Sequence, residues 1–480
     1  MNARIEKSDL LRFRFRIERD CGARKMSKKS FVGQRVLFRL EGLRWRNVSY
    51  LLLTMIFTLV AFLSQAINAD QPSFPRILSL SEALSMIDED HPDVMMARSQ
   101  VSLARAEKLA LDAQGAVEMH VRLEWRQVDR LVDPSHHFID DSRATLLIDK
   151  PITRFGRDRI SNKALNARVA GLFQRELVAD SQMRLNVVRA FFDVIVSDYA
   201  HAAVDEEMTL SFLAFSRARD RMEEYQEIPE VEVRRLESVY LSLLARRTAT
   251  ADAQRMSRLK LALALNRPDA YPSQVIEPVL SDHQRDMPDY DALFEVVSMK
   301  SPEIIAARLE VEEAEQRLTL TSRKFDPTLG LQLQGVNYAE RFSGSRDQYR
   351  AMVYLDIPIG SALSKKADIE TSRIRVLQSK ATLQLMEHRL REQVLGLVHR
   401  LGQLNSEVNA AKAELLYREL ELDKVRLQYE MEVRARIGSA NAEVAKALYH
   451  QKRMEYERAL IWEQIYALSG EESSFFSSEG

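Results

Sequence analysis

A cluster of histidine and aspartate in DPSHHFIDD, residues 133–141, contains side chains of the kind that bind metal ions. His136 and His137 lie among Asp133, Asp140 and Asp141. Imidazole and carboxylate groups bind zinc when three or four of them converge on one point. Their spacing here matches no standard zinc motif, and polar loops between strands commonly face water. The sequence therefore predicts a solvated hairpin loop and no metal site.

Other chemistry is also weakly represented in the chain. The sequence contains no nucleotide-binding glycine loop, no nucleophile elbow and no catalytic histidine cluster. Its single cysteine, Cys21, excludes a disulfide framework and a cysteine-based zinc site. We therefore expect neither enzyme activity nor a cofactor, and the function must come from how the elements are arranged.

Residues 1–69 have the pattern of a signal peptide. A long basic region precedes the apolar run 51–63, and small residues offer cleavage after Ala66 or Ala69. An uncleaved anchor at 48–67 is the alternative, and Met26 is an alternative start. The whole sequence has 69 basic and 70 acidic residues, and cleavage after Ala69 removes 14 of the basic and 5 of the acidic ones. The remaining 55 basic and 65 acidic residues give a net charge of −10. Such an acidic chain is a poor binder of nucleic acid.

The remaining chain contains one unit twice. HPDVMMARSQV begins at His91 and SPEIIAARLEV begins at Ser301, with the same pattern of proline, apolar pair and Ala-Arg. Each motif lies in a helical stretch, which we predict to span 81–114 in the first copy and 290–324 in the second. No run of 18 apolar residues follows the signal peptide. The mature chain is thus expected to be periplasmic, secreted or inserted in a membrane as strands.

After each helical stretch, apolar and polar residues alternate, which is typical of half-buried strands. We predict strands at about 117–126 and 142–151, and at about 328–337 and 347–358. Their length, about ten residues, is what a tilted membrane strand needs. The apolar faces, predicted to face lipid, comprise Val117, Met119, Val121, Leu123, Trp125, Tyr349, Ala351, Val353 and Leu355. The opposite face, predicted to face the lumen of a barrel, carries Glu118, Arg122 and Glu124, which would line a pore or simply be solvated.

Two very long helices follow the strand pairs, at about 158–226 and 361–429, because these segments contain few helix breakers. Apolar residues in the second keep a spacing of three and four, the mark of a coiled coil. Each would be roughly 100 Å long from the helical rise of ~1.5 Å per residue. The return helices, 230–266 and 438–470, are about half as long. We infer that each long helix packs against two shorter helices stacked end to end.

This order of elements resembles the TolC family of outer membrane efflux proteins, over about residues 79–470. The entry LSLSEAL at 78–84, the turn at Pro92 and the segment LNRP at 265–268 also fit. Strand-to-helix turns carry Pro151 and Gly156 in the first copy, and Pro358 and Gly360 in the second. The expected fold class is therefore mainly α with a membrane β-barrel, built from two TolC-like repeats.

The domains follow from this resemblance. Residues 70–270 would form the first repeat and 290–470 the second, joined by a linker at 271–289 and followed by a flexible tail at 471–480. The helical tips, at about 226–232 and 430–438, depart from the family's glycine-centred turns. They carry the candidate adaptor contacts Ile228, Pro229, Glu230, Arg436, Gly438 and Ser439.

The resemblance implies a homotrimer whose barrel of about twelve strands lies in the outer membrane of a Gram-negative cell, with its helices in the periplasm. It also implies a periplasmic adaptor and an inner membrane pump as partners, and small toxic molecules as cargo. A channel of a type I secretion system, with protein or peptide cargo, is the first alternative. A periplasmic coiled-coil scaffold without a pore is the second.

Overall fold

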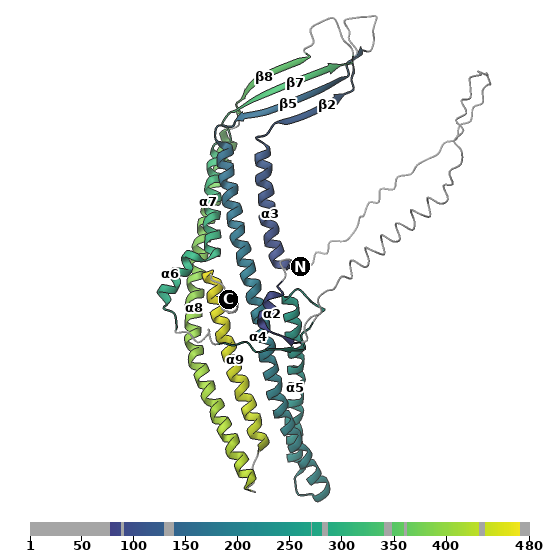
Figure 1. Cartoon of the computed structure of the whole chain (residues 1–480), viewed down its shortest axis with the longest axis vertical. Helices are drawn as coiled ribbons and strands as arrows, with labels where there is room; N and C mark the ends of the chain where they lie inside the picture. Colours follow the sequence, from purple (N-terminus) through teal and green to yellow (C-terminus); the bar gives the residue numbers. More distant parts are fainter. Residues whose placement is uncertain are drawn as a thin grey trace, which may run out of the picture. The chain divides into compact units, whose positions relative to one another are not determined.

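The computed structural model describes residues 77–87, 91–128, 139–269, 271–280, 287–339, 348–359, 362–431 and 437–470. The expected signal peptide and tail lie outside these residues, as do Gly360, Arg436 and 129–138. Two halves of the described chain repeat one order: paired short helices, strands, a long helix and a return helix (Figure 1). The first half comprises α2 (Leu80–Ser85), α3 (Pro92–Ala113), β2 (Glu118–Glu124), β5 (Arg143–Thr153), α4 (Arg157–Tyr225) and α5 (Glu230–Ala264). The second comprises α6 (Tyr290–Lys300), α7 (Pro302–Ser322), β7 (Thr328–Tyr338), β8 (Tyr349–Asp356), α8 (Ala362–Glu430) and α9 (Ile437–Ser469).

The helices before the strands are broken, so the prediction of one continuous helix at 81–114 and another at 290–324 was wrong. His91 has φ −58° and ψ 131°, and Ser301 has φ −57° and ψ 120°. Each precedes a proline, whose ring disfavours the α conformation in the residue before it. The break therefore separates α2 from α3 and α6 from α7.

The two long helices, α4 and α8, have 69 residues each. Helix α4 packs against α3 and α5, and α8 packs against α7 and α9 (Figure 1). This packing confirms that each long helix is covered by two shorter ones. Helix α4 also contacts α7 and α9, which belong to the other half. The halves are therefore packed together along their helices.

The core follows the middle of the long helices. Val187, Phe191 and Val194 of α4 are fully buried, and Leu401 and Leu404 of α8 are too. These α8 residues belong to the predicted coiled-coil seam, and they pack in one cluster with residues of α9. Burial of this seam explains why the 3,4 spacing is visible in the sequence.

Short parallel strands, β1 (Ile77–Leu78) and β6 (Gln274–Val275), bring the linker beside the start of the first half. Glu277, which follows β6, accepts hydrogen bonds from Lys452 Nζ, Tyr199 Oη and Tyr456 Oη. Burial raises the pKa of the Glu277 carboxyl, but these hydrogen bonds outweigh it and hold the pKa below its usual value. Glu277 thus ties the linker to both α4 and α9, and we call these four residues the Glu277 cluster.

The strands form an antiparallel sheet in the order β2-β5-β7-β8. Strand β5 continues to Thr153, although the sequence predicted its end at Pro151. Its pairing with β2 ends at Asp149, and its register with β7 shifts between Pro151 and Thr153. A proline lacks the N–H of a ladder hydrogen bond, but an unpaired side and an irregularity accommodate it. Two more strands, β3 (Gln127–Val128) and β4 (Ile139–Asp140), extend the first hairpin.

Candidate functional site

The register of the four-stranded sheet aligns apolar residues across all its strands. Val121 pairs with Leu146 and Met119 with Ile148. Ile148 in turn pairs with Leu333, and Leu333 with Ala351. Directly paired residues point to the same face of a sheet. One face of the sheet is therefore apolar from β2 through β8.

This apolar face is exposed in the single chain. Val121 is 73% exposed, Leu123 is 77% exposed and Val353 is 66% exposed. Monomeric soluble proteins rarely expose a continuous apolar surface of several strands, and such surfaces mark membrane or protein interaction sites. The sheet therefore has a face that needs a covering of lipid or protein.

The residues predicted to face lipid lie on or beside this face. Val117 and Trp125 flank β2 just outside its ends, and Trp125 is 90% exposed. Tyr349, Ala351 and Val353 occupy alternate positions of β8. The remaining members of the predicted set lie within the strands and are also exposed: Met119, Val121, Leu123 and Leu355.

The opposite face of the sheet is polar. Glu118, Arg122 and Glu124 alternate with the apolar residues of β2, and Arg143 Nε donates to Glu124 Oε2 over 2.6 Å. Further along this face, Tyr354 Oη donates to Asp149 Oδ2 over 3.1 Å. Charged and hydrogen-bonded groups of this kind suit contact with water.

A glycine on the polar face makes room for that tyrosine. Gly330 pairs with Tyr354, and a Cβ at Gly330 would overlap the Tyr354 ring. The ring therefore lies across the strand where a side chain would otherwise stand. Sequence reasoning missed Gly330, Tyr354 and Asp149, because their relationship appears only once the register is known.

Both edge strands, β2 and β8, lack a second partner among the described strands. An edge exposes unpaired N–H and C=O groups, which can pair with a further strand. Strands alternate in direction across the sheet, so β2 and β8 run in opposite directions. A β8 edge could thus pair antiparallel with the β2 edge of another copy.

The turn from β5 to α4 depends on left-handed backbone. Gly156 has φ 89°, a conformation that glycine adopts without the Cβ clash, and Phe155 before it has φ 50°. Arg154 donates to the carbonyl of Gln114 at the end of α3 over 2.7 Å. Arg157 donates to Thr328 Oγ1 at the start of β7 over 2.5 Å. These two arginines, which the sequence did not single out, connect the turn to both halves.

The other turn residues are only partly described. Pro151 lies inside β5, as noted, and Pro358 follows the end of β8. Gly360 lies outside the described residues. The structure thus gives a backbone reason for Gly156 alone among the four predicted turn residues.

The tip residues between α4 and α5 are described in full. Pro229 is the N-cap of α5 with φ −62° and ψ 142°, Glu230 is the first helical residue, and Ile228 is half-buried. Arg234 pairs with Glu230 and with Glu237 in the first turns of α5. This tip is therefore a proline-started, charged helix end.

The glycine of the second tip, Gly438, contacts α4 well before the end of that helix. Gly438 lies in the first turn of α9, and a Cβ there would overlap Leu210 Cδ2 of α4. Leu210 precedes the end of α4 by 15 residues, or roughly 22 Å of helix. Ser439 is exposed next to Gly438, and Arg436 lies outside the described residues. Gly438 therefore serves close packing of α9 on α4.

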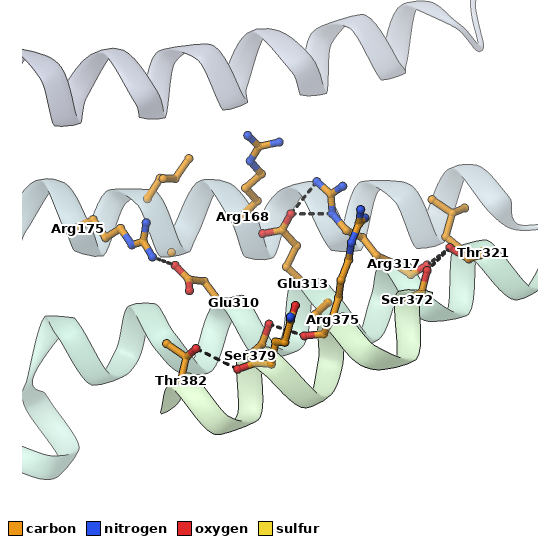
Figure 2. A pocket seen from close by; sticks show the side chains of 15 residues that line it. Arg168, Arg175, Glu310, Glu313, Arg317, Thr321, Ser372, Arg375, Ser379 and Thr382 are labelled. Atoms are coloured by element: carbon orange, nitrogen blue, oxygen red, sulfur yellow. Dashed lines mark hydrogen bonds and ion pairs between the residues drawn. The ribbon is translucent and has the colours of Figure 1, made fainter. Parts of the chain in front are cut away.

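A polar groove of about 600 Å³ lies among α4, α7 and α8 (Figure 2). Arg175 of α4 pairs with Glu310 of α7, and Arg317 pairs with Glu313 over 2.7 Å. Figure 2 shows these side chains lining one groove. The Arg175–Glu310 pair joins α4 of the first half to α7 of the second, whereas Arg317 and Glu313 both belong to α7. Within the described residues, no three His, Cys, Asp or Glu gather as metal ligands.

Among the described helices, none combines the length and the apolar character required to span a bilayer. The apolar residues of these helices are instead spread along seams, separated by charged positions.

Comparison with known proteins gave results for structure only. No family model matches the chain, and no curated protein matches it significantly. Among solved structures, the Campylobacter jejuni CmeC outer membrane channel is similar, with a TM-score of 0.67 at 12% identity, covering 82% of this chain and 86% of that one. The open state of the Neisseria gonorrhoeae MtrE outer membrane channel gives 0.65 at 15% identity, covering 84% and 94%. The Vibrio cholerae outer membrane protein VceC gives 0.63 at 13% identity, covering 82% and 96%.

These similarities extend over most of the described chain and over most of each neighbour. They confirm the fold class that the sequence predicted, a mainly helical TolC-like fold with a strand region. At such low identity they carry the arrangement of the backbone, and the chemistry of this chain must be argued from its own residues.

Proposed function

We propose that this protein is the outer membrane channel of a tripartite efflux system, a passive exit duct and not an enzyme. The observation that supports it best is the single apolar face that runs in register through β2, β5, β7 and β8. In a membrane barrel this face contacts lipid, and the opposite polar face lines a water-filled interior. Both faces are present in the described sheet.

The barrel of this proposal is shared among copies of the chain. Backbone groups at an open edge in lipid would lack hydrogen bonds, so a membrane sheet must close. Four strands from one chain are too few, and β8 of one copy can pair antiparallel with β2 of the next. Three copies would supply about twelve strands, a number within the range of known membrane barrels. The channel would then be a homotrimer with its sheet in the outer membrane.

The helices of this trimer would extend into the periplasm and form the walls of the duct. Their tips, near Pro229 and Gly438, would meet a periplasmic adaptor that connects to an inner membrane pump. In this proposal the duct is passive, and the energy for transport would come from that pump. Small toxic molecules are the proposed cargo.

Conductance combined with membrane fractionation tests the proposal. The mature protein, purified in detergent, should be a trimer by native mass spectrometry, since four strands cannot close a barrel alone. It should sediment with the outer membrane and give stepwise conductance in planar bilayers. A stable monomer without conductance would support a periplasmic scaffold instead. A conducting trimer whose deletion blocks export of a protein, and leaves drug tolerance unchanged, would identify a type I secretion channel.

A further inference from the structure

A cavity of about 330 Å³ lies at the joint where α9 ends and α7 begins, between α4 and α8. Its lining includes Ser301 and Pro302 from the start of α7 and Gln464 from the end of α9. Gly470, with φ 68°, ends α9 against the carbonyl of Lys300, to which a Cβ would lie 3.5 Å away. The cavity is therefore fixed by the meeting of two stacked helices.

The hydroxyl of Ser301 has no hydrogen-bond partner in this cavity. Ser301 is 1% exposed, and its Oγ is a buried polar atom without a partner. Serine at the residue before a helix normally caps it, yet the Ser301 side chain makes no cap bond to α7. In the first half the corresponding residue, His91, does accept the N–H of Asp93 through Nδ1. An unpaired buried hydroxyl costs free energy unless something else bonds to it.

More polar groups of the lining are also free among the described residues. The half-buried side chains of Ser181 and Gln464 and the exposed side chain of Gln393 line the cavity without a hydrogen bond to another residue. Serine hydroxyls and glutamine amides both donate and accept. Gly396, one turn after Gln393 on α8, is exposed and has open space where a Cβ would be, with no atom within 4 Å. The cavity is thus left open on one side by a glycine.

The charges of the lining balance, because Arg189 and Glu303 contribute one of each sign. Apolar side chains, including Leu185 and Leu397, provide further contact surface. A lining with mixed donors and acceptors, no excess charge and aliphatic patches fits an uncharged ligand that carries many hydroxyl groups.

We propose that this joint cavity binds a sugar, with Ser301, Gln393 and Gln464 as the hydrogen-bonding residues. The volume, about 330 Å³, is at the small end of ligand pockets, which suits one sugar unit. The hydroxyl groups of the sugar would bond to the amides and to Ser301, and its C–H faces would contact the leucines. This inference goes beyond the channel function and does not depend on it.

Ligand binding to the mature full chain tests the proposal. The protein is purified in a polyoxyethylene detergent, because sugar-headed detergents would compete. N-acetylglucosamine and its β-1,4-linked tetramer are used as probes, by saturation-transfer NMR and calorimetry. Glucuronate and glucosamine are the charged comparisons, expected to bind more weakly. Binding of N-acetylglucosamine alone would indicate a closed site for a free sugar. Tighter binding of the β-1,4-linked tetramer would indicate a site that takes part of a glycan strand.

Two variants and two matched controls locate the binding. Gly396→Leu places a side chain across the open side of the cavity, on a helix that tolerates leucine better than glycine, and should abolish binding. Ser301→Ala should weaken affinity by about three- to tenfold, through one lost hydrogen bond. Ser298→Ala, whose hydroxyl bonds to the carbonyl of Glu295, and the exposed Glu392→Leu on α8 should bind as the wild type does.

All four variants must keep the wild-type thermal transition for the comparison to hold, and Ser301→Ala serves if Gly396→Leu does not fold. Absence of binding to the wild type would overturn the proposal and leave water as the occupant. Equal affinity of Gly396→Leu and the wild type would also overturn it. Neither result bears on conductance, so the channel function stands or falls separately.

Discussion

Neighbouring side chains of β2 face opposite surroundings, although they are joined by a single peptide bond. Val121 and Arg122 are both exposed, yet Val121 lies on the apolar face and Arg122 on the charged one. Alternation in the sequence predicted these faces, because strand side chains have a period of two. The contacts of Arg154, Arg157 and Tyr354 were not predictable in this way. They join residues far apart in the chain, whose meeting depends on the register of the sheet.

Adding a charge to the apolar face of the sheet should be more harmful than removing one from its polar face. We expect Val121→Arg to impair membrane assembly at a cost of about 2–4 kcal/mol, since a cation near the bilayer midplane is costly. Val353→Arg on β8 should behave likewise. The control, Arg122→Val on the polar face, should assemble normally and change only conductance. Heat-modifiable migration of the trimer measures assembly, and equal tolerance of all three changes would argue against lipid contact.

The Glu277 cluster predicts a dependence of stability on pH. The hydrogen bonds hold the pKa of Glu277 below its unfolded value of about 4.5, so this stabilisation is complete above that value. It is lost as the pH falls through the lower pKa of the folded state. Glu277→Gln should therefore lower the thermal midpoint at pH 7, through a loss in the free energy of unfolding of up to about 1–3 kcal/mol before discounting for exposure. The deficit should shrink toward pH 3, whereas a constant deficit would exclude Glu277 ionisation as its cause.

At the scale of elements, the lengths of the helices were predictable and their interruptions were not. The coiled-coil spacing and the scarcity of breakers placed α4 and α8 within a residue of their observed ends. The proline at 92 was recognised as a turn and the one at 302 as its counterpart in the repeat, but neither was used to divide the helical stretches predicted at 81–114 and 290–324. Short strands such as β1 and β6 carry too few residues for a periodicity, and their pairing joins segments about 200 residues apart.

The turn between β5 and α4 should depend on Gly156. A side chain at φ 89° is strained, so Gly156→Ala should destabilise the protein by about 1–2 kcal/mol. Gly115→Ala is the matched control, because that glycine has no positive φ and its nearest atom would lie 3.5 Å away. Denaturant unfolding of the two variants measures the difference. Similar midpoints for both would show that the left-handed turn relaxes without cost.

At the scale of the whole molecule, the order of the elements identified the fold, and the neighbours in structure share it at 12–15% identity. Few individual residues are common to them at that identity. A periodic pattern survives many substitutions, because any apolar residue of suitable size maintains a seam or a strand face. The number of chains in the proposed channel could not be predicted from the pattern of one chain and came from the resemblance.

The proposed topology predicts which positions are accessible from outside the cell. Cleavage of the proposed signal peptide would remove Cys21, the single cysteine of the sequence, so one introduced thiol could then be labelled without background. With a reagent too large to cross the outer membrane, cysteine at Ser135 or Ser343 should react on intact cells. Both lie outside the described residues, Ser135 between β3 and β4 in the sequence and Ser343 between β7 and β8. Cysteine at Ser439, near the helical tips about 100 Å away, should react only after the envelope is opened.

The labelling pattern separates the alternatives for this molecule. A periplasmic scaffold predicts no reaction at any of the three positions before opening. Reaction at Ser439 alone on intact cells would reverse the topology.

The equal lengths of α4 and α8 have a consequence for how such a protein could arise. Each half contributes one hairpin and one 69-residue helix, and the halves meet in the sheet where β5 pairs with β7. The contact between β5 and β7 inside one chain is thus of the same kind as the contact proposed between β8 and β2 of successive copies. If a gene encoded a single half, six copies of its protein product would be needed to supply the strands that three duplicated chains supply. Fusion of two such genes would convert half of the subunit interfaces into covalently linked ones, and would then free the halves to diverge, as their unlike tips have done.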